Sequence, residues 1–236
     1  GYGWWSHDIG GHMRGYRDDE LSVRWLQFGG FSPINRLHST NSPFNGKEPW
    51  NYNAIACQVM KRYLRLRHAL IPYLYTMNCD AALKGRPLIR PMYYPEPERR
   101  PNEYYFGTEM IVCPITHPHD KASGTGSFRA WLPEGQWFDF FNGMVYDGGR
   151  MLTLHRDIED IPVLVKAGGI VPMADYEEFT NSVENPSSLR IRIYPGANGN
   201  FVLQEDNDGG ADRRSVSTSM DWNWEENVFT ICKPLG

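Results

Sequence analysis

Cysteine is scarce in this chain, with four residues among 236. Cys57, Cys79, Cys113 and Cys232 are too widely spaced for a C-x-x-C motif, so the sequence predicts neither a zinc site nor a redox pair. No other pattern indicates a cofactor. Free thiols, together with a start at Gly1 that shows no signal peptide, lead us to expect a cytoplasmic location.

Long apolar runs and an excess of positive charge are also missing. No segment approaches the roughly 20 apolar residues that a bilayer-spanning helix needs, so no membrane partner is expected. Lys and Arg number 24 against 28 Asp and Glu, and without a basic stripe no nucleic-acid partner is expected. Aromatic residues, at 14%, exclude a disordered chain.

Residues 1–86 alternate short strand-like runs with helix-like runs, which is typical of an α/β domain. The acidic run 18–20 predicts a helix start, because unpaired backbone N–H groups favour negative charge there. Gly29-Gly30 predicts the end of that helix. A long helix is predicted over residues 52–83, with a kink at Pro72.

From residue 87 onward the pattern is all-β. Short aromatic and β-branched runs alternate with turns such as Pro133-Glu134-Gly135, so we expect a β-sandwich over residues 87–176. The polar stretch 175–188 is interpreted as a linker. Residues 177–236 hold too few strands for a sandwich of their own, and we interpret them as part of one.

Several motifs resemble glycoside hydrolase family 31, which includes α-glucosidases. Ser6-His7-Asp8-Ile9-Gly10-Gly11-His12 is similar to the family's DIGGF-like strand exit, and Arg24-Trp25 to its RW-containing helix. Phe31-Ser32-Pro33-Ile34-Asn35-Arg36-Leu37-His38 is similar to a second strand exit, F-x-P-x-x-R-x-H. Residues 70–75, 131–140 and 161–172 extend the resemblance into the last barrel helix and the sandwich. The order and spacing of these motifs make the joint signal specific.

The resemblance implies a fold of class α/β plus all-β. Residues 1–86 would form the C-terminal βα units of a (β/α)8 barrel, residues 87–176 a proximal β-sandwich, and residues 177–236 a partial distal β-sandwich. It also implies a fragment of a retaining α-glycosidase, an enzyme type that uses two aspartates, one as nucleophile and one as acid and then base. In the family both aspartates precede the DIGGF-like motif. We therefore expect no catalytic residue within this chain, and no activity of the chain alone.

The resemblance assigns substrate binding in subsite −1 to Asp8 and His38. A carboxylate accepts hydroxyl donors, and a neutral imidazole both donates and accepts. Arg36 is interpreted as orienting a carboxylate. His12 departs from the family's common Phe, keeping a planar ring but adding a polar edge, which leaves the preferred linkage open. Trp5 is a further candidate for the sugar site, although a tryptophan there equally suits core packing.

Structural explanations compete with each of these assignments. A single aspartate after a strand is commonly a turn or cap acceptor, and a single histidine a satisfied core residue. The acidic run 18–20 is better explained as a helix start than as a carboxylate site. His117-Pro118-His119-Asp120 is expected in a solvated loop rather than at a metal. Asp206-Asn207-Asp208-Gly209 lacks the glutamate of a calcium loop and predicts a hairpin turn.

Functions of other classes stay open. The β-rich part could be a carbohydrate-binding module with exposed aromatic residues, or a structural module that buttresses the barrel through a hydrophobic seam. The expected partner is an α-linked oligosaccharide or glucoside. Uncovered strand edges in an incomplete barrel further predict aggregation or a homo-oligomer.

Overall fold

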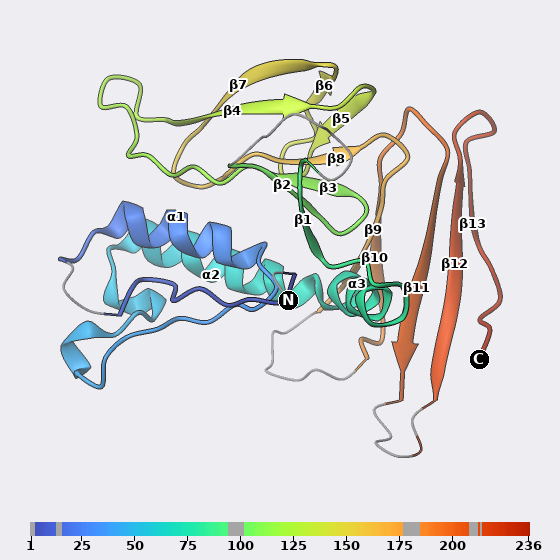
Figure 1. The fold of residues 1–236 in the computed structure, drawn as a ribbon, viewed down its shortest axis with the longest axis horizontal. Coiled ribbons are helices and arrows are strands. Elements are labelled where there is room, and N and C mark those ends of the chain that lie inside the picture. The colour runs from blue at the N-terminus through green and yellow to red at the C-terminus, as the bar shows by residue number, and fades with distance from the viewer. Residues whose placement is uncertain (1–2, 13–15, 94–101, 177–184, 208–211, 213) are drawn as a thin grey trace.

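The computed structural model describes residues 3–12, 16–93, 102–176, 185–207, 212 and 214–236. Figure 1 shows helices α1 (Asp19–Gly30) and α2 (Ala54–Ala69) side by side, a group of strands packed next to them, and a separate group of long strands toward the C-terminus. The architecture is mixed α/β with more strands than helices, and the described residues form no closed barrel. Within them, no helix is long and apolar enough to cross a membrane.

The helical part confirms the predicted start of the first helix. Its elements are α1 (Asp19–Gly30), η1 (Pro43–Asn45), η2 (Pro49–Asn51), α2 (Ala54–Ala69) and α3 (Ile71–Lys84). The Asp18 side chain caps α1 by accepting a hydrogen bond of 2.9 Å from the Leu21 amide. A left-handed Gly85, at φ 66°, ends α3.

The single kinked helix predicted over residues 52–83 is wrong, because the structure has two helices. Helix α2 ends at Ala69 and α3 starts at Ile71, with Leu70 as the joint. Pro72 has no N–H to donate to the carbonyl of His68, and in a continuous helix its ring would clash with that carbonyl. The proline therefore separates the helices instead of bending one.

The glycine pair expected to end the first helix lies inside its last turn. Helix α1 runs through Gly30, and Phe31 caps it with its amide bonded to the carbonyl of Phe28. Gly29 is there for packing, since a Cβ atom at this position would lie 2.3 Å from Cδ1 of Ile9. The missing side chain allows the segment that carries Ile9 to pack directly on the helix.

The described residues of the β part form four sheets. Its strands are β1 (Ile89–Pro91), β2 (Tyr104–Phe106), β3 (Met110–Val112), β4 (Gly126–Leu132), β5 (Gln136–Asp139), β6 (Val145–Asp147), β7 (Arg150–Arg156), β8 (Val163–Lys166), β9 (Ile170–Ala174), β10 (Leu189–Ile193), β11 (Gly199–Asp206), β12 (Ser215–Asn223) and β13 (Val228–Ile231). A six-stranded sheet has the order β1-β2-β3-β8-β5-β6, and β4 pairs with β7. The other sheets are β9-β10 and β11-β12-β13. Each of these strand pairs is antiparallel.

Strand pairing crosses the predicted boundary at residue 176. Strand β9 lies before it and β10 after it, yet the two pair from Ile170↔Ile193 to Leu189↔Ala174. Of the predicted linker, residues 177–184 lie outside the described part of the chain. Strands β11 and β12 are antiparallel on either side of the predicted turn at 206–209, whose last two residues are also outside it.

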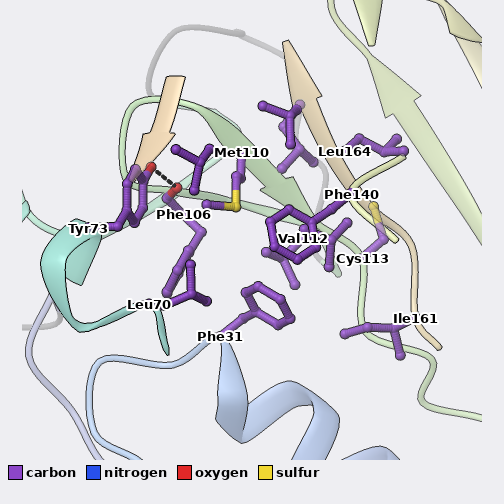
Figure 2. Packing of buried hydrophobic residues seen from close by; sticks show 14 of the residues in the cluster. Phe31, Leu70, Tyr73, Phe106, Met110, Val112, Cys113, Phe140, Ile161 and Leu164 are labelled. Atoms are coloured by element: carbon purple, nitrogen blue, oxygen red, sulfur yellow. Dashed lines mark hydrogen bonds between the residues drawn. The ribbon is translucent and has the colours of Figure 1, made fainter. Parts of the chain in front are cut away.

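One apolar core joins the helices to the six-stranded sheet. Figure 2 shows Phe31, at the end of α1, pointing toward Val112 and Phe140 of the β part. The Phe31 ring meets those of Phe106 and Phe140 edge to face, at 5.4 and 6.3 Å between centroids. The buried Tyr73 hydroxyl donates a 2.9 Å hydrogen bond to the Phe106 carbonyl. The helices and the six-stranded sheet therefore pack against each other around a shared core.

Candidate functional site

Two extended segments lie parallel at the N-terminal end of the molecule. They are joined by the bridges Ser6↔Ile34 and Ile9↔Leu37. The Ile9 amide donates to the Arg36 carbonyl at 3.3 Å, and the His38 amide to the Ile9 carbonyl at 3.1 Å. Because parallel neighbours end at the same edge, Asp8 and His38 come to one side of the structure, the position of barrel active sites.

A charged cluster of Asp8, Arg36 and His38 forms at this edge. Oδ1 of Asp8 forms an ion pair with the Arg36 guanidinium, and Oδ2 lies 3.8 Å from Nε2 of His38. About half of the Asp8 and Arg36 side chains is exposed, against 26% of His38. The carboxylate is therefore oriented by one partner while its second oxygen stays open to a hydroxyl donor.

His12 joins the cluster through His38. Its Nδ1 atom lies 2.7 Å from Nε2 of His38, within hydrogen-bond distance. The preceding Gly10 and Gly11 have φ of 90° and 76°, and the Gly11 amide donates to the Asp8 carbonyl at 2.8 Å. This tight turn, which favours glycine at both positions, brings His12 back toward the cluster.

Trp5, the remaining predicted site residue, lies elsewhere. Its ring packs against His7, with centroids 5.1 Å apart, and against Phe28 of α1, at 5.8 Å. Side chains alternate along an extended segment, so Trp5 and His7 face the helix while Asp8 faces away. The structure brings together Asp8, Arg36, His38 and His12, and places Trp5 in the packing beneath them.

A hydrogen-bond chain under Asp8 was not predicted from the sequence. The Trp25 indole donates to Nδ1 of His7 at 2.7 Å, and Nε2 of His7 lies 3.0 Å from the Ser32 hydroxyl. That hydroxyl donates to the Phe28 carbonyl at 2.9 Å. Burial lowers the pKa of His7, against a smaller opposing effect of Asp8. Because Nδ1 accepts from the indole and the Ser32 hydroxyl donates onward, His7 is neutral with Nε2 protonated. In the sequence, only the position of His7 next to Asp8 indicated a role for it.

Arg67 of α2 is a second residue that the sequence analysis missed. Its guanidinium donates to the carbonyls of Gly30, at 3.2 Å, and Pro33, at 2.7 Å, and also to that of Ser32. Burial lowers its pKa to about 10. Arg67 therefore satisfies carbonyls at the end of α1 and holds the entry to the segment that carries Arg36 and His38. In the sequence, Arg67 could have been noticed because it follows Tyr63 by one helical turn and so shares the buried face of the helix.

The acidic run and the histidine patch take part in capping and ion pairs at the start of α1. Asp18 caps α1, Asp19 pairs with Arg17, and Glu20 contacts His119 at 2.6 Å between Oε2 and Nδ1. Among the described residues, no group of three or more His, Cys, Asp or Glu could hold a metal ion. The loop is exposed at residues 117–120, as predicted, and it also contacts α1 through His119.

A cavity of about 310 Å³ lies away from the Asp8 cluster, between the starts of α1 and α2 and two sandwich loops. Its lining includes Glu20, Arg24, Ile55, His119 and Ile158, and neither Asp8 nor His38. The cavity is a gap at the junction of helices and sandwich. The Asp8 cluster, in contrast, is open to solvent where the two segments end, and it combines the oriented carboxylate with two imidazoles. It is therefore the better candidate for a ligand-binding site.

A pair of parallel segments backed by helices, with polar side chains at one edge, is the arrangement that neighbouring βα units have in a barrel-type domain. Residues 1–77 match the model of the glycosyl hydrolases family 31 TIM-barrel domain, and residues 85–171 match that of the glycosyl hydrolase family 31 C-terminal domain. The chain belongs to glycoside hydrolase family 31.

Two curated relatives with names of α-glycosidases match most of the chain. The chain is 30% identical over 204 residues to alpha-glucosidase 2 of Bacillus thermoamyloliquefaciens, covering 84% of this chain and 25% of that protein. It is 31% identical over 216 residues to an alpha-xylosidase of Saccharolobus solfataricus, covering 87% and 28%. The chain thus spans about a quarter of the length of these relatives.

Solved structures agree in fold over almost the whole chain. The GH31 alpha-xylosidase of Xanthomonas citri superposes with a TM-score of 0.80 at 31% identity, over 92% of this chain and 24% of that one. The GH31 dextranase of Flavobacterium johnsoniae, complexed with glucose, gives 0.83 at 27% identity, over 99% and 31%. The similarity therefore extends through the distal strands that the two family models do not cover.

Proposed function

We propose that this chain forms one wall of the −1 sugar subsite of a retaining α-glycosidase that hydrolyses α-glycosidic bonds of oligosaccharides. The observation that carries the proposal is the Asp8 carboxylate, paired with Arg36 and adjacent to His38 at the edge of two parallel segments. Relatives named α-glucosidase, α-xylosidase and dextranase support this substrate class.

Asp8 and His38 bind and orient the sugar in this proposal. Arg36 engages Oδ1 of Asp8, which leaves Oδ2 to accept from a sugar hydroxyl. Such a bond is charge-assisted and therefore stronger than one between neutral groups. Nε2 of His38 lies on the same side and supplies a second contact to that sugar.

We place the nucleophile and the acid/base outside this chain. A retaining glycosidase needs two carboxyl groups about 5–5.5 Å apart that flank the glycosidic bond. Asp8 is held in an ion pair with Arg36, and the acidic run 18–20 is engaged in capping α1 and in pairing with Arg17 and His119. The chain spans about a quarter of the length of its relatives. This supports the placement of the catalytic groups elsewhere in a longer enzyme.

The sandwich has a structural role in this proposal. The buried Arg24 of α1 donates to the carbonyls of Asp157 and Asp160, both at 2.7 Å, and Gln27 donates to that of Ile158 at 2.8 Å. Together with the aromatic seam around Phe31, these contacts favour a buttress over a separate carbohydrate-binding module.

Two measurements on the 236-residue chain test the proposal. The purified chain should release no aryl group from 4-nitrophenyl α-glucoside, and turnover above trace level would refute the placement of the catalytic groups. In an NMR titration with maltotriose, the resonances of Asp8, Arg36 and His38 should shift. Shifts confined to residues 87–236 would support the binding module and refute the −1 subsite.

The chain's partner and location are proposals of the same kind. Strand β13 is an edge of its sheet, and Ile231, which is 57% exposed, continues the inner apolar face beside Met220. We propose that two copies of this chain associate through that edge. Light scattering should show a concentration-dependent dimer that Ile231→Glu weakens. The four free cysteines support a reducing, cytoplasmic location.

A further inference from the structure

The Nε2 atom of His38 has two polar neighbours, and they are not equivalent. Nδ1 of His12 lies 2.7 Å away and Oδ2 of Asp8 3.8 Å away. The two imidazole planes are 18° from parallel, with centroids 4.7 Å apart. Stacked faces could not bring two nitrogens this close, so the rings meet edge to edge. The contact is a hydrogen bond between imidazoles.

A ring nitrogen carries either one proton or one lone pair, so it forms one in-plane hydrogen bond. His12 takes that bond of Nε2. A sugar hydroxyl that binds this atom needs the same direction and has to displace the His12 imidazole. Without His12, Oδ2 of Asp8 at 3.8 Å would remain as a polar neighbour of this atom.

The two histidines differ in how firmly they are held. The His38 amide is bonded to the Ile9 carbonyl, and its side chain is largely covered. His12 is exposed and follows two glycines with positive φ, whose backbone is permissive. His12 is therefore the ring that can turn away while His38 stays in place.

We propose that His12 caps the hydrogen-bonding edge of His38 in the sugar-free protein, and that an incoming sugar hydroxyl displaces it. This inference rests on the proposed sugar-binding function. It makes His12 a specificity-determining residue, because only a sugar with a hydroxyl at that point has to break the imidazole pair.

Substitution of His12 tests the proposal through sugar affinity. His12→Phe keeps a planar ring without a nitrogen, and His12→Ala removes the ring. Because each abolishes a competing hydrogen bond, both should bind methyl α-glucoside about three- to tenfold more tightly in an NMR titration of the chain. Against a set of monodeoxy glucosides, the gain should vanish for the one that lacks the displacing hydroxyl. His155→Ala, on the exposed face of β7, is the matched control and should change nothing.

Imidazole ¹⁵N spectra of the wild-type chain give a readout that needs no variant. Without sugar, the spectra should show one proton in a hydrogen bond between Nδ1 of His12 and Nε2 of His38. With sugar, the ¹⁵N chemical shift of Nδ1 of His12 should change to that of a solvent-exposed nitrogen. The shift of Nε2 of His38 should remain that of a hydrogen-bonded nitrogen.

The outcomes separate this inference from the proposed function. Sugar-induced shifts at Asp8 and His38, with His12 unmoved and no gain in either variant, overturn the displacement and leave the subsite intact. If sugar shifts neither Asp8 nor His38 in any variant, the subsite itself is refuted and the inference with it.

Discussion

The indole nitrogen of Trp25 lies 2.7 Å from Nδ1 of His7 and donates a hydrogen bond to it. The bond links α1 to the segment that ends in Asp8, and it requires an unprotonated Nδ1. The neutral ring then directs its Nε2 proton to Ser32, which lies just before the segment that carries Arg36 and His38. One imidazole thus connects the two segments from behind the cluster.

Replacement of Trp25 should weaken that connection. Trp25→Phe keeps an aromatic ring but removes the donor and leaves Nδ1 of His7 unsatisfied. A loss of about 1 kcal/mol in unfolding free energy is expected in urea. Trp131→Phe is the comparison variant, because Trp131 lies in β4 and outside the N-terminal segments. Equal stability of Trp25→Phe and wild type would show that the bond contributes nothing.

The neutral state of His7 predicts a pH dependence of stability. Burial lowers its pKa below the usual 6.5, so the unfolded chain takes up a proton more readily than the folded one. This contribution to stability is complete above about pH 6.5 and is lost as the pH falls through the lowered folded-state value. Melting temperatures measured between about pH 5 and 8 should fall on the acid side, and less so for His7→Gln. An identical acid-side fall in both proteins would exclude His7 as its source.

The local part of this architecture could be predicted from sequence. The acidic start of α1 follows from the orphan N–H groups of a helix, and Asp18 occupies the cap. The strand-exit motifs indicated that Asp8 and His38 end neighbouring parallel segments, and the bridges at Ile9 and Ser6 agree with that geometry.

Contacts distant in sequence could not be predicted in this way. Arg24 reaches carbonyls 133 and 136 residues away, and nothing in the local pattern specifies such partners. Helix α1 covers one face of the segment that carries Trp5. A pattern over a few residues does not define which face that is, so the position of Trp5 could not be predicted. The joint at Leu70 was misjudged because proline at the second position of a new helix and proline inside a kinked one look alike in sequence.

Gly29 makes close packing of Ile9 on α1 possible, so its replacement should disturb the segment that bears Asp8. A Cβ atom there would lie 2.3 Å from Cδ1 of buried Ile9, and Gly29→Ala should cost about 1–3 kcal/mol in stability. Gly30→Ala is the matched control, because its Cβ atom would lie 3.3 Å from Tyr63, a milder contact.

The same clash predicts a rescue. Ile9→Val removes the Cδ1 atom, so the double variant Gly29→Ala/Ile9→Val should recover part of the lost stability in a double-mutant cycle. Strictly additive losses would show that Ile9 is not what Gly29 accommodates.

Arg24 should hold the sandwich to the helices. Arg24→Met keeps much of the volume but leaves the carbonyls of Asp157 and Asp160 without their donor. A loss of about 3 kcal/mol is expected, with faster proteolysis around residues 157–160. The exposed Arg129 of β4 offers the matched control, Arg129→Met. Unchanged proteolysis in Arg24→Met would contradict the docking role.

Asp8 should matter for sugar binding far more than for folding. Asp8→Asn keeps the shape but loses the charge that both Arg36 and a hydroxyl donor use, so the affinity for methyl α-glucoside should fall about tenfold or more. The melting temperature should change little, because the Asp8–Arg36 pair is about half exposed and such pairs add little stability. Asp147→Asn, at an exposed position of β6, should leave both quantities unchanged. If Asp8→Asn binds the sugar as tightly as wild type, the carboxylate is not a sugar ligand, and the cluster with Arg36 only joins the two segments.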